Sequence, residues 1–278
     1  MKQLVQKFLG KFGYSLRRTS ALKTFAPFIR DFNFPEASFR MWIANADAKT
    51  WYEQEQWAKF GEFRALRKLV KKGDQVLEIG SHHGFTAMLL SKFVGPEGRV
   101  LSVEAHPQNA MIDHAQLGLN RSFSNLKFIH AACSDVPGTV KIFPSHNSNV
   151  VNENSNAANQ ETTDLIEVPA VTGDMLDKEH GPFDVVKIDV EGYEMEVLKG
   201  CKNLLSRAPK LALEIHMDWL GWRGQSMADI FKLIDVKRYD GEMILRHEHV
   251  NTDTVQAFDP SAIPKNGQAN VFLERKRG

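Results

Sequence analysis

The chain has little of what marks several classes of protein. Nowhere does it approach the ~18 consecutive apolar residues that a membrane-spanning helix needs. It has only two cysteines, Cys133 and Cys201. They lie far apart and form no metal-binding pair, so we interpret them as free thiols in a reducing cytosol. The formal net charge is only +1, which gives no indication of nucleic-acid binding. With 42% hydrophobic residues, the 278-residue chain predicts a globular domain with a substantial core.

Acidic residues are missing from the N-terminus, where seven lysines and arginines precede Asp31. Apolar side chains recur there at helical spacing, at Leu4, Val5, Phe8, Leu9 and Phe12. This pattern predicts a basic amphipathic helix within an N-terminal helical extension over residues 1–50, ahead of a catalytic domain over 51–278. The helix has two interpretations: packing against its own domain or a second copy, or peripheral contact with an anionic membrane surface.

Strand and helix patterns alternate from residue 75 onward. Strands are predicted over 75–79, 99–104, 126–132, 168–172, 185–189 and 211–216, with terminal strands over 243–246 and 269–274. Helices are predicted over 85–93, 107–120 and 227–234. Repeated units of this kind predict an α/β fold with a doubly wound, mostly parallel sheet and helices on both faces. The Asn- and Ser-rich residues 145–164 predict a long loop.

Ligands of such sheets bind beyond the carboxyl ends of the strands, and polar residues follow several of the predicted strands here. The first strand continues into a glycine-bracketed turn, from which we expect cofactor contacts by Glu78, Gly80, Ser81, His82 and Gly84. The backbone amides that open the next helix suit an anionic group. The pattern G-x-G-x-x-G of dinucleotide sites is absent, because Ser81-His82-His83 replaces the central glycine.

The next two strand ends extend the predicted cofactor site. Glu104, followed by Ala105, is placed to accept hydrogen bonds from two ribose hydroxyls, a geometry that a carboxylate provides well. Asp135 has two interpretations: contact with an adenine edge, or ordinary turn chemistry before Pro137-Gly138.

The run KIDVEGYEMEVLKG, residues 187–200, closely resembles the signature of the FkbM family of S-adenosylmethionine-dependent methyltransferases. The segments VLEIGSHHGF, VEAHP, AACSDVPGTV and LALEIH follow that family's order, and the resemblance covers about residues 53–218. It implies a class I methyltransferase (Rossmann-like) fold and S-adenosyl-L-methionine as cofactor. The implied reaction is methyl transfer to a hydroxyl oxygen, typically of a sugar or secondary metabolite. His82 departs from the asparagine that is common in the family.

Four polar residues are expected to form the catalytic end of this site. Asp189 and Glu191 end one central strand, and Glu214 and His216 end its expected neighbour. We predict His216 as general base, because an unperturbed imidazole has a pKa near ~6.5. Asp189 would orient the acceptor or the methyl donor, with Glu191 and Glu214 in supporting or substrate contacts. Other interpretations are a hydrogen-bonded core histidine at His216, and a divalent metal on Asp189, Glu214 and His216.

The sequence therefore predicts a cytoplasmic methyltransferase that acts on a hydroxyl of a saccharide or glycolipid; it assigns no metal ligands and leaves open whether a divalent metal is used. Rival functions are methylation of a secondary metabolite or an amine, and a cofactor-binding scaffold without turnover. Trp219 and Trp222 are interpreted either as an apolar wall for a sugar ring or as packing for the N-terminal helix. The identity of the acceptor and the oligomeric state do not follow from the sequence.

Overall fold

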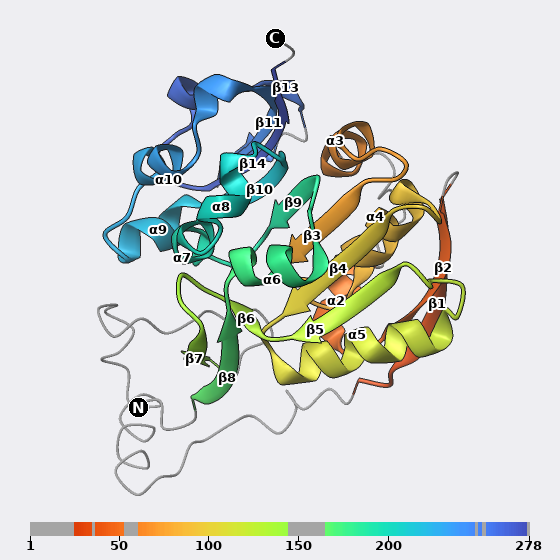
Figure 1. The fold of residues 1–278 in the computed structure, drawn as a ribbon. Coiled ribbons are helices and arrows are strands. Elements are labelled where there is room, and N and C mark those ends of the chain that lie inside the picture. The colour runs from red at the N-terminus through yellow and green to blue at the C-terminus, as the bar shows by residue number, and fades with distance from the viewer. Residues whose placement is uncertain are drawn as a thin grey trace, which may run out of the picture.

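The computed structural model describes residues 25–34, 37–52, 61–143, 165–247, 250–251 and 254–276. Within these residues the largest sheet has nine strands, in the order β12-β11-β14-β10-β9-β3-β4-β5, with β13 paired to β11 (Figure 1). The parallel strands are β3 (Gln75–Ile79), β4 (Arg99–Glu104), β5 (Leu126–His130), β9 (Val185–Ile188) and β10 (Lys210–His216). The antiparallel end consists of β11 (Tyr239–His247), β12 (Val250–Asn251), β13 (Gln256–Ala257) and β14 (Gln268–Arg275).

Helices cover both faces of this sheet, as the strand patterns predict. All four residues of β9 are buried, because a central parallel strand is covered on both sides. Leu77 and Ile79 pack in one core, with α6 (Gly173–His180), α7 (Glu194–Lys199), α8 (Lys202–Ser206) and α10 (Met227–Leu233). Val76 points the other way, into a second core with α3 (Gly61–Leu69) and α4 (Phe85–Val94). The doubly wound fold is confirmed.

The segment before residue 50 differs from its predicted helical form. Residues Phe28–Phe34 (β1) and Ala37–Ile43 (β2) pair as an antiparallel hairpin, followed by α2 (Ala46–Tyr52). Phenylalanines explain the difference: Phe32 and Phe39 alternate with exposed residues, and this period of two favours strands over helices. The predicted basic helix near residues 4–12 and the predicted loop over 145–164 lie outside the described residues.

The strand predicted over 168–172 belongs to a different sheet from the one expected. It corresponds to β8 (Ile166–Val171), which lies between β6 (Ala132–Cys133) and β7 (Gly138–Ile142) in a separate three-stranded sheet. Its side chains alternate: Glu167 and Pro169 are exposed, whereas Val168 and Ala170 are buried. That alternation is typical of a sheet with one solvated face, unlike the fully buried β9.

Three short elements complete the described part of the chain: α9 (Met217–Trp222), η4 (Val236–Arg238) and η5 (Pro260–Ala262). Among the helices that the structure describes, none combines the length and apolar character that crossing a bilayer requires.

Helix α5 (Pro107–Leu119) fixes the hairpin to the domain through amide side chains. Asn120, at its C-terminal end, accepts a hydrogen bond from the Arg40 backbone N–H (2.8 Å) and donates to the Arg40 carbonyl (2.7 Å). Gln116 makes the same pair of contacts with the backbone of Trp42, at 2.8 and 3.1 Å. The two side-chain amides therefore make hydrogen bonds to the backbone of β2 that a neighbouring strand would otherwise make.

Removal of either amide should destabilise the protein measurably. Gln116→Ala or Asn120→Ala leaves backbone groups of β2 without partners, so each should lower the free energy of unfolding by about 1–3 kcal/mol. Urea denaturation followed by circular dichroism measures the loss. Gln108→Ala, at an exposed position of the same helix, is the matched control and should stay within about 0.5 kcal/mol of the unaltered protein. Equal stability of all three variants would contradict the role of the amides.

Candidate active site

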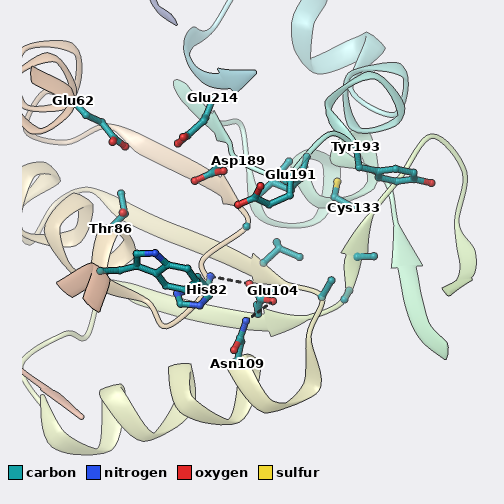
Figure 2. A pocket seen from close by; sticks show the side chains of 18 of the residues that line it. Glu62, His82, Thr86, Glu104, Asn109, Cys133, Asp189, Glu191, Tyr193 and Glu214 are labelled. Atoms are coloured by element: carbon teal, nitrogen blue, oxygen red, sulfur yellow. Dashed lines mark hydrogen bonds between the residues drawn. The ribbon is translucent and has the colours of Figure 1, made fainter. Parts of the chain in front are cut away.

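A cavity of about 390 Å³ lies where the carboxyl ends of the parallel strands meet. The strand order reverses between β3 and β9, the point at which open α/β sheets bind ligands. Figure 2 shows the acidic side chains of Glu62, Asp189, Glu191 and Glu214 at one side, with Glu104 and His82 on the opposite wall. The remaining wall residues are Trp51, Tyr52, Ile79, Gly80, Thr86, Val103, Ala105, Asn109, Ala131, Ala132, Cys133, Val190, Tyr193 and Arg246.

The turn after β3 requires glycine at two positions because the chain packs closely around it. Gly80 has φ +91°, and a Cβ there would lie 1.9 Å from the carbonyl oxygen of Asp189. Gly84 has φ +75°, and its Cβ would lie 2.9 Å from Asp113 Oδ1. The Ser81 hydroxyl donates a hydrogen bond to Asp113 Oδ2 at 2.6 Å. Of the predicted turn residues, Gly80 and His82 line the described cavity wall, whereas Ser81 and Gly84 shape the turn from behind it.

His82 connects the turn to both sides of the cavity. Its backbone has φ 54°, and its N–H donates to Glu104 Oε2 at 2.8 Å. Its ring lies 4.0 Å from that of His83 and 4.8 Å from that of Trp51, between ring centroids. The Tyr52 hydroxyl is hydrogen-bonded to His82 Nδ1. The contacts from α2 were not predicted, since a helix that precedes the sheet carries no local signal of where its aromatic side chains will lie.

Glu104 lies in the wall with its carboxylate oriented by the backbone. Oε2 accepts from the His82 N–H, and Oε1 accepts from the His106 N–H (2.8 Å) and the Asn109 amide (3.5 Å) (Figure 2). Burial raises the pKa of Glu104 to about 7, although these hydrogen bonds lower it. Ala105 lies next to it in the wall. Both residues therefore line the cavity at the end of β4.

Asp135 does not reach the cavity. Its side chain is exposed and accepts a hydrogen bond from Ser134 Oγ at 3.1 Å. The corresponding part of the wall consists of Ala131, Ala132 and Cys133. The position of this side chain, away from the cavity, favours the turn interpretation over the adenine contact, because the chain turns outward once it has passed β6.

Glu78 is also displaced from its predicted role. In the sheet it is flanked by Ser102 of β4 and Lys187 of β9. Its Oε2 accepts from the Ser102 hydroxyl at 2.6 Å, and its Oε1 lies 4.0 Å from Lys187 Nζ. The side chain is fully buried and is not part of the described cavity wall, so it lies away from the position that its predicted cofactor contact requires. Burial raises the pKa of Glu78 to about 7.

Lys187 is a buried partner of two carboxylates. Its Nζ lies 3.5 Å from Asp189 Oδ2 and 4.0 Å from Glu78 Oε1. Burial alone would lower the pKa of Lys187, but the two carboxylates raise it. Burial alone would raise the pKa of Asp189, but the charges of Lys187 and His216 and the hydrogen bonds to the carboxyl together lower it. Asp189 is therefore ionised at neutral pH.

The structure brings Asp189, Glu191, Glu214 and His216 together, since β9 and β10 are neighbours. His216 itself lies behind the wall, with Nδ1 2.9 Å from Glu194 Oε1 and Nε2 3.3 Å from Glu191 Oε2. Burial alone would lower its pKa, but the hydrogen bond to Glu194 and the charge of Glu191 raise the pKa of His216 to about 10. An imidazolium cannot accept a proton, so these surroundings favour a charged, hydrogen-bonded His216 over the predicted general base.

The other two carboxyl groups titrate above their usual range. Burial raises the pKa of Glu191, although the nearby His216 charge lowers it. Burial raises the pKa of Glu214 well above its ordinary value, and the charge of Asp189 adds to this effect. Glu214 Oε1 also lies 3.7 Å from Arg246 Nη1, whose other nitrogen, Nη2, lies 3.7 Å from Glu62 Oε2. Glu62 and Arg246 come from distant parts of the chain and could not be found by a local motif.

Comparison with known proteins gives matches to methyltransferases. Residues 78–243 match the model of the methyltransferase FkbM domain. The hexuronic acid methyltransferase AglP of Haloferax volcanii is 26% identical over 184 residues, which are 65% of this chain and 69% of that protein. Among solved structures, a methyltransferase FkbM from Methylobacillus flagellatus is 16% identical with a TM-score of 0.43, over 72% of this chain but only 43% of that one. Aeropyrum pernix fibrillarin with bound S-adenosyl-L-methionine is 16% identical with a TM-score of 0.42, over 76% of each chain.

The protonation state of His216 can be observed directly. In buffer that contains a chelator, ¹H–¹⁵N NMR at pH 8 should show both ring nitrogens of His216 protonated, because the folded pKa of about 10 lies above that pH. The resonances are assigned by their loss in His216→Gln. A ring that loses its proton near pH ~6.5, like a free imidazole, would contradict this charge state and restore His216 as a candidate base.

Proposed function

The chain belongs to the FkbM family of S-adenosylmethionine-dependent methyltransferases, and we propose that it transfers a methyl group to a hydroxyl oxygen of a saccharide. One observation carries this proposal. The same cavity combines a carboxylate suited to a ribose, Glu104, with an acidic end formed by Asp189, Glu191 and Glu214. A positively charged methyl donor and an acceptor hydroxyl both find partners in such a site.

The cavity wall fits the parts of S-adenosylmethionine. Glu104 is held by two backbone N–H groups and retains lone pairs for the two ribose hydroxyls. Small side chains of Ala132 and Cys133 leave room for a flat base. Asp189, which the Lys187 charge keeps ionised, is suited to a cationic group. When bound, the cofactor supplies a methyl group on a positively charged sulfur, which becomes neutral once the methyl has left.

The acidic end supports oxygen methylation through Glu191. A hydroxyl is a weak nucleophile, so a nearby base should take its proton as the new C–O bond forms. Glu191 lines the cavity, its side chain is 31% exposed, and its raised pKa makes it a better proton acceptor than an ordinary carboxylate. His216 lies 3.3 Å from its Oε2 and fixes the side chain, which leaves Oε1 to accept the proton.

Two observations favour a saccharide as acceptor. The relative AglP is named a hexuronic acid methyltransferase. In this chain, Trp219 and Trp222 form an edge-to-face pair with ring centroids 4.8 Å apart and exposed fractions of 36% and 68%. Trp219 packs on Gly192, where a Cβ would lie 2.3 Å from Trp219 Cβ, directly after Glu191 of the cavity wall. Exposed aromatic side chains beside a cavity are suited to the apolar face of a sugar ring.

Glu104→Gln should weaken cofactor binding specifically. Loss of the charge weakens the hydrogen bonds from the two ribose hydroxyls, and bonds to a charged group contribute about 1.5–3 kcal/mol. The expected rise in Kd for S-adenosylmethionine is therefore about 10–100-fold, measured by calorimetry at pH 8. Glu167→Gln, the same substitution at a side chain that is 66% exposed on β8, should bind as the unaltered protein does. An unchanged Kd in Glu104→Gln would contradict the ribose contact.

The proposed reaction is tested by transfer of labelled methyl from S-adenosylmethionine to a panel of neutral and uronic saccharides. We expect a methyl ether, which is stable to mild alkali. Glu191→Gln should reduce kcat by about 10²–10⁴-fold, because the hydroxyl proton loses its acceptor. The Kd for the cofactor should change little, and Glu167→Gln should retain full activity.

Other products would contradict the proposal in distinguishable ways. Label released by mild alkali would identify a carboxyl group as the acceptor, in which case no base is needed. Label found only in amines would indicate nitrogen methylation. Normal turnover of Glu191→Gln with an ether product would leave the reaction in place and remove Glu191 as the base.

A further inference from the structure

Three potential metal ligands meet at the acidic end of the cavity. One ligand atom from each of Asp189, Glu214 and His216 lies within 4.8 Å of the other two. Glu214 and His216 are two residues apart on β10 and therefore share a face of that strand. Asp189 follows β9, the parallel neighbour of β10. Two of the three, Asp189 and Glu214, line the cavity, so the cluster is accessible to a small ion.

The surroundings of His216 are those of a metal-binding histidine. Its Nδ1 is hydrogen-bonded at 2.9 Å to Glu194 Oε1, whose side chain is 1% exposed. Metal-bound histidines generally use one ring nitrogen for the ion and donate the other N–H to a carboxylate or carbonyl. Here Glu194 occupies Nδ1, and the other nitrogen, Nε2, faces Glu191 Oε2 at 3.3 Å and the Gln268 side-chain amide at 3.5 Å, which a metal ion would displace. Glu194 in turn is held by the Gly192 N–H at 3.0 Å.

The charge around the cluster favours a cation. Four carboxyl groups face it or its histidine, from Asp189, Glu191, Glu194 and Glu214. Two described basic residues contact these carboxyl groups: Lys187 lies 3.5 Å from Asp189, and Arg246 lies 3.7 Å from Glu214. Each is shared with a further carboxyl group, Lys187 with Glu78 and Arg246 with Glu62. Buried carboxylates need a proton, a cation or a metal ion as a partner.

We propose that Asp189, Glu214 and His216 bind one divalent cation, Mn²⁺ or Mg²⁺. Mixed carboxylate and imidazole donors suit Mn²⁺, and carboxylates with completing waters suit Mg²⁺. If the proposed function holds, the ion lies beside the acceptor hydroxyl and polarises its O–H bond, so that Glu191 removes the proton more easily. The role of the ion in catalysis rests on that function; its binding does not.

Binding is measured on the full chain after removal of metal ions with a chelator. Titration with Mn²⁺, followed by electron paramagnetic resonance of the free ion, should show one site per chain. Asp189→Asn and Glu214→Gln should lose it. Asp31→Asn and Glu167→Gln make the same changes at side chains that are each 66% exposed and should bind like the unaltered protein. Glu194→Gln, which keeps all three ligands, should weaken Mn²⁺ by about 10–100-fold through the orientation of His216.

The outcomes separate the cation site from the reaction. Circular dichroism confirms that each variant is folded, and Glu194→Gln provides the test if a ligand variant fails to fold. Mn²⁺ binding that is absent, or equal in the cluster variants and their controls, overturns the proposal. Methyl transfer that survives the chelator unchanged overturns the role of the ion in catalysis and leaves the methyltransferase function standing. Bound Mn²⁺ without any methyl transfer to a saccharide supports the site and contradicts the proposed acceptor.

Discussion

The close approach of Gly80 to Asp189 is the constraint on which the rest of the site depends. The Asp189 N–H donates to the Ile79 carbonyl at 3.0 Å, and a Cβ on Gly80 would lie 1.9 Å from the Asp189 carbonyl oxygen. The two strand ends at the reversal of strand order are therefore in direct backbone contact. One contributes the turn that leads to His82 and, through it, to Glu104; the other contributes Asp189 and Glu191. A side chain at residue 80 would push apart the two strand ends, and with them Glu104 on one side and Asp189 and Glu191 on the other.

A second constraint is electrostatic and lies beneath the first. Lys187 is buried between Glu78 and Asp189, at 4.0 and 3.5 Å. A single ammonium cannot neutralise both carboxyl groups fully in a low-dielectric interior. The outcome differs with position: burial raises the pKa of Glu78 to about 7, whereas the nearer Lys187 and His216 lower the pKa of Asp189. Glu78 thus lies buried behind the cavity wall, and the negative charge is carried mainly by Asp189, which lines the cavity.

The sequence predicts this fold well because the decisive signals are local. Buried runs such as β9 and glycine-bracketed turns such as that after β3 are set by neighbouring residues, and strand-end carboxylates follow directly from them. Glu104 and Asp189 were found in this way. The predictions fail where a residue's role depends on distant partners. Glu78 has Ser102 and Lys187 beside it only because β3 lies between β4 and β9. Trp51, Glu62 and Arg246 reach the cavity from elements with no motif of their own.

His216 shows most clearly why residue type alone cannot assign a catalytic role. An isolated imidazole is the natural base near neutral pH, but α7 brings Glu194 to one ring nitrogen and the turn before it brings Glu191 to the other. Because these two carboxylates raise the pKa of His216, its ring holds a second proton and binds carboxylates as a cation. In the cation site that we propose, a metal ion would replace the proton on Nε2, because the same surrounding carboxylates would hold either cation. In the proposed reaction the base is Glu191, the carboxyl group that combines access to the cavity with a raised pKa.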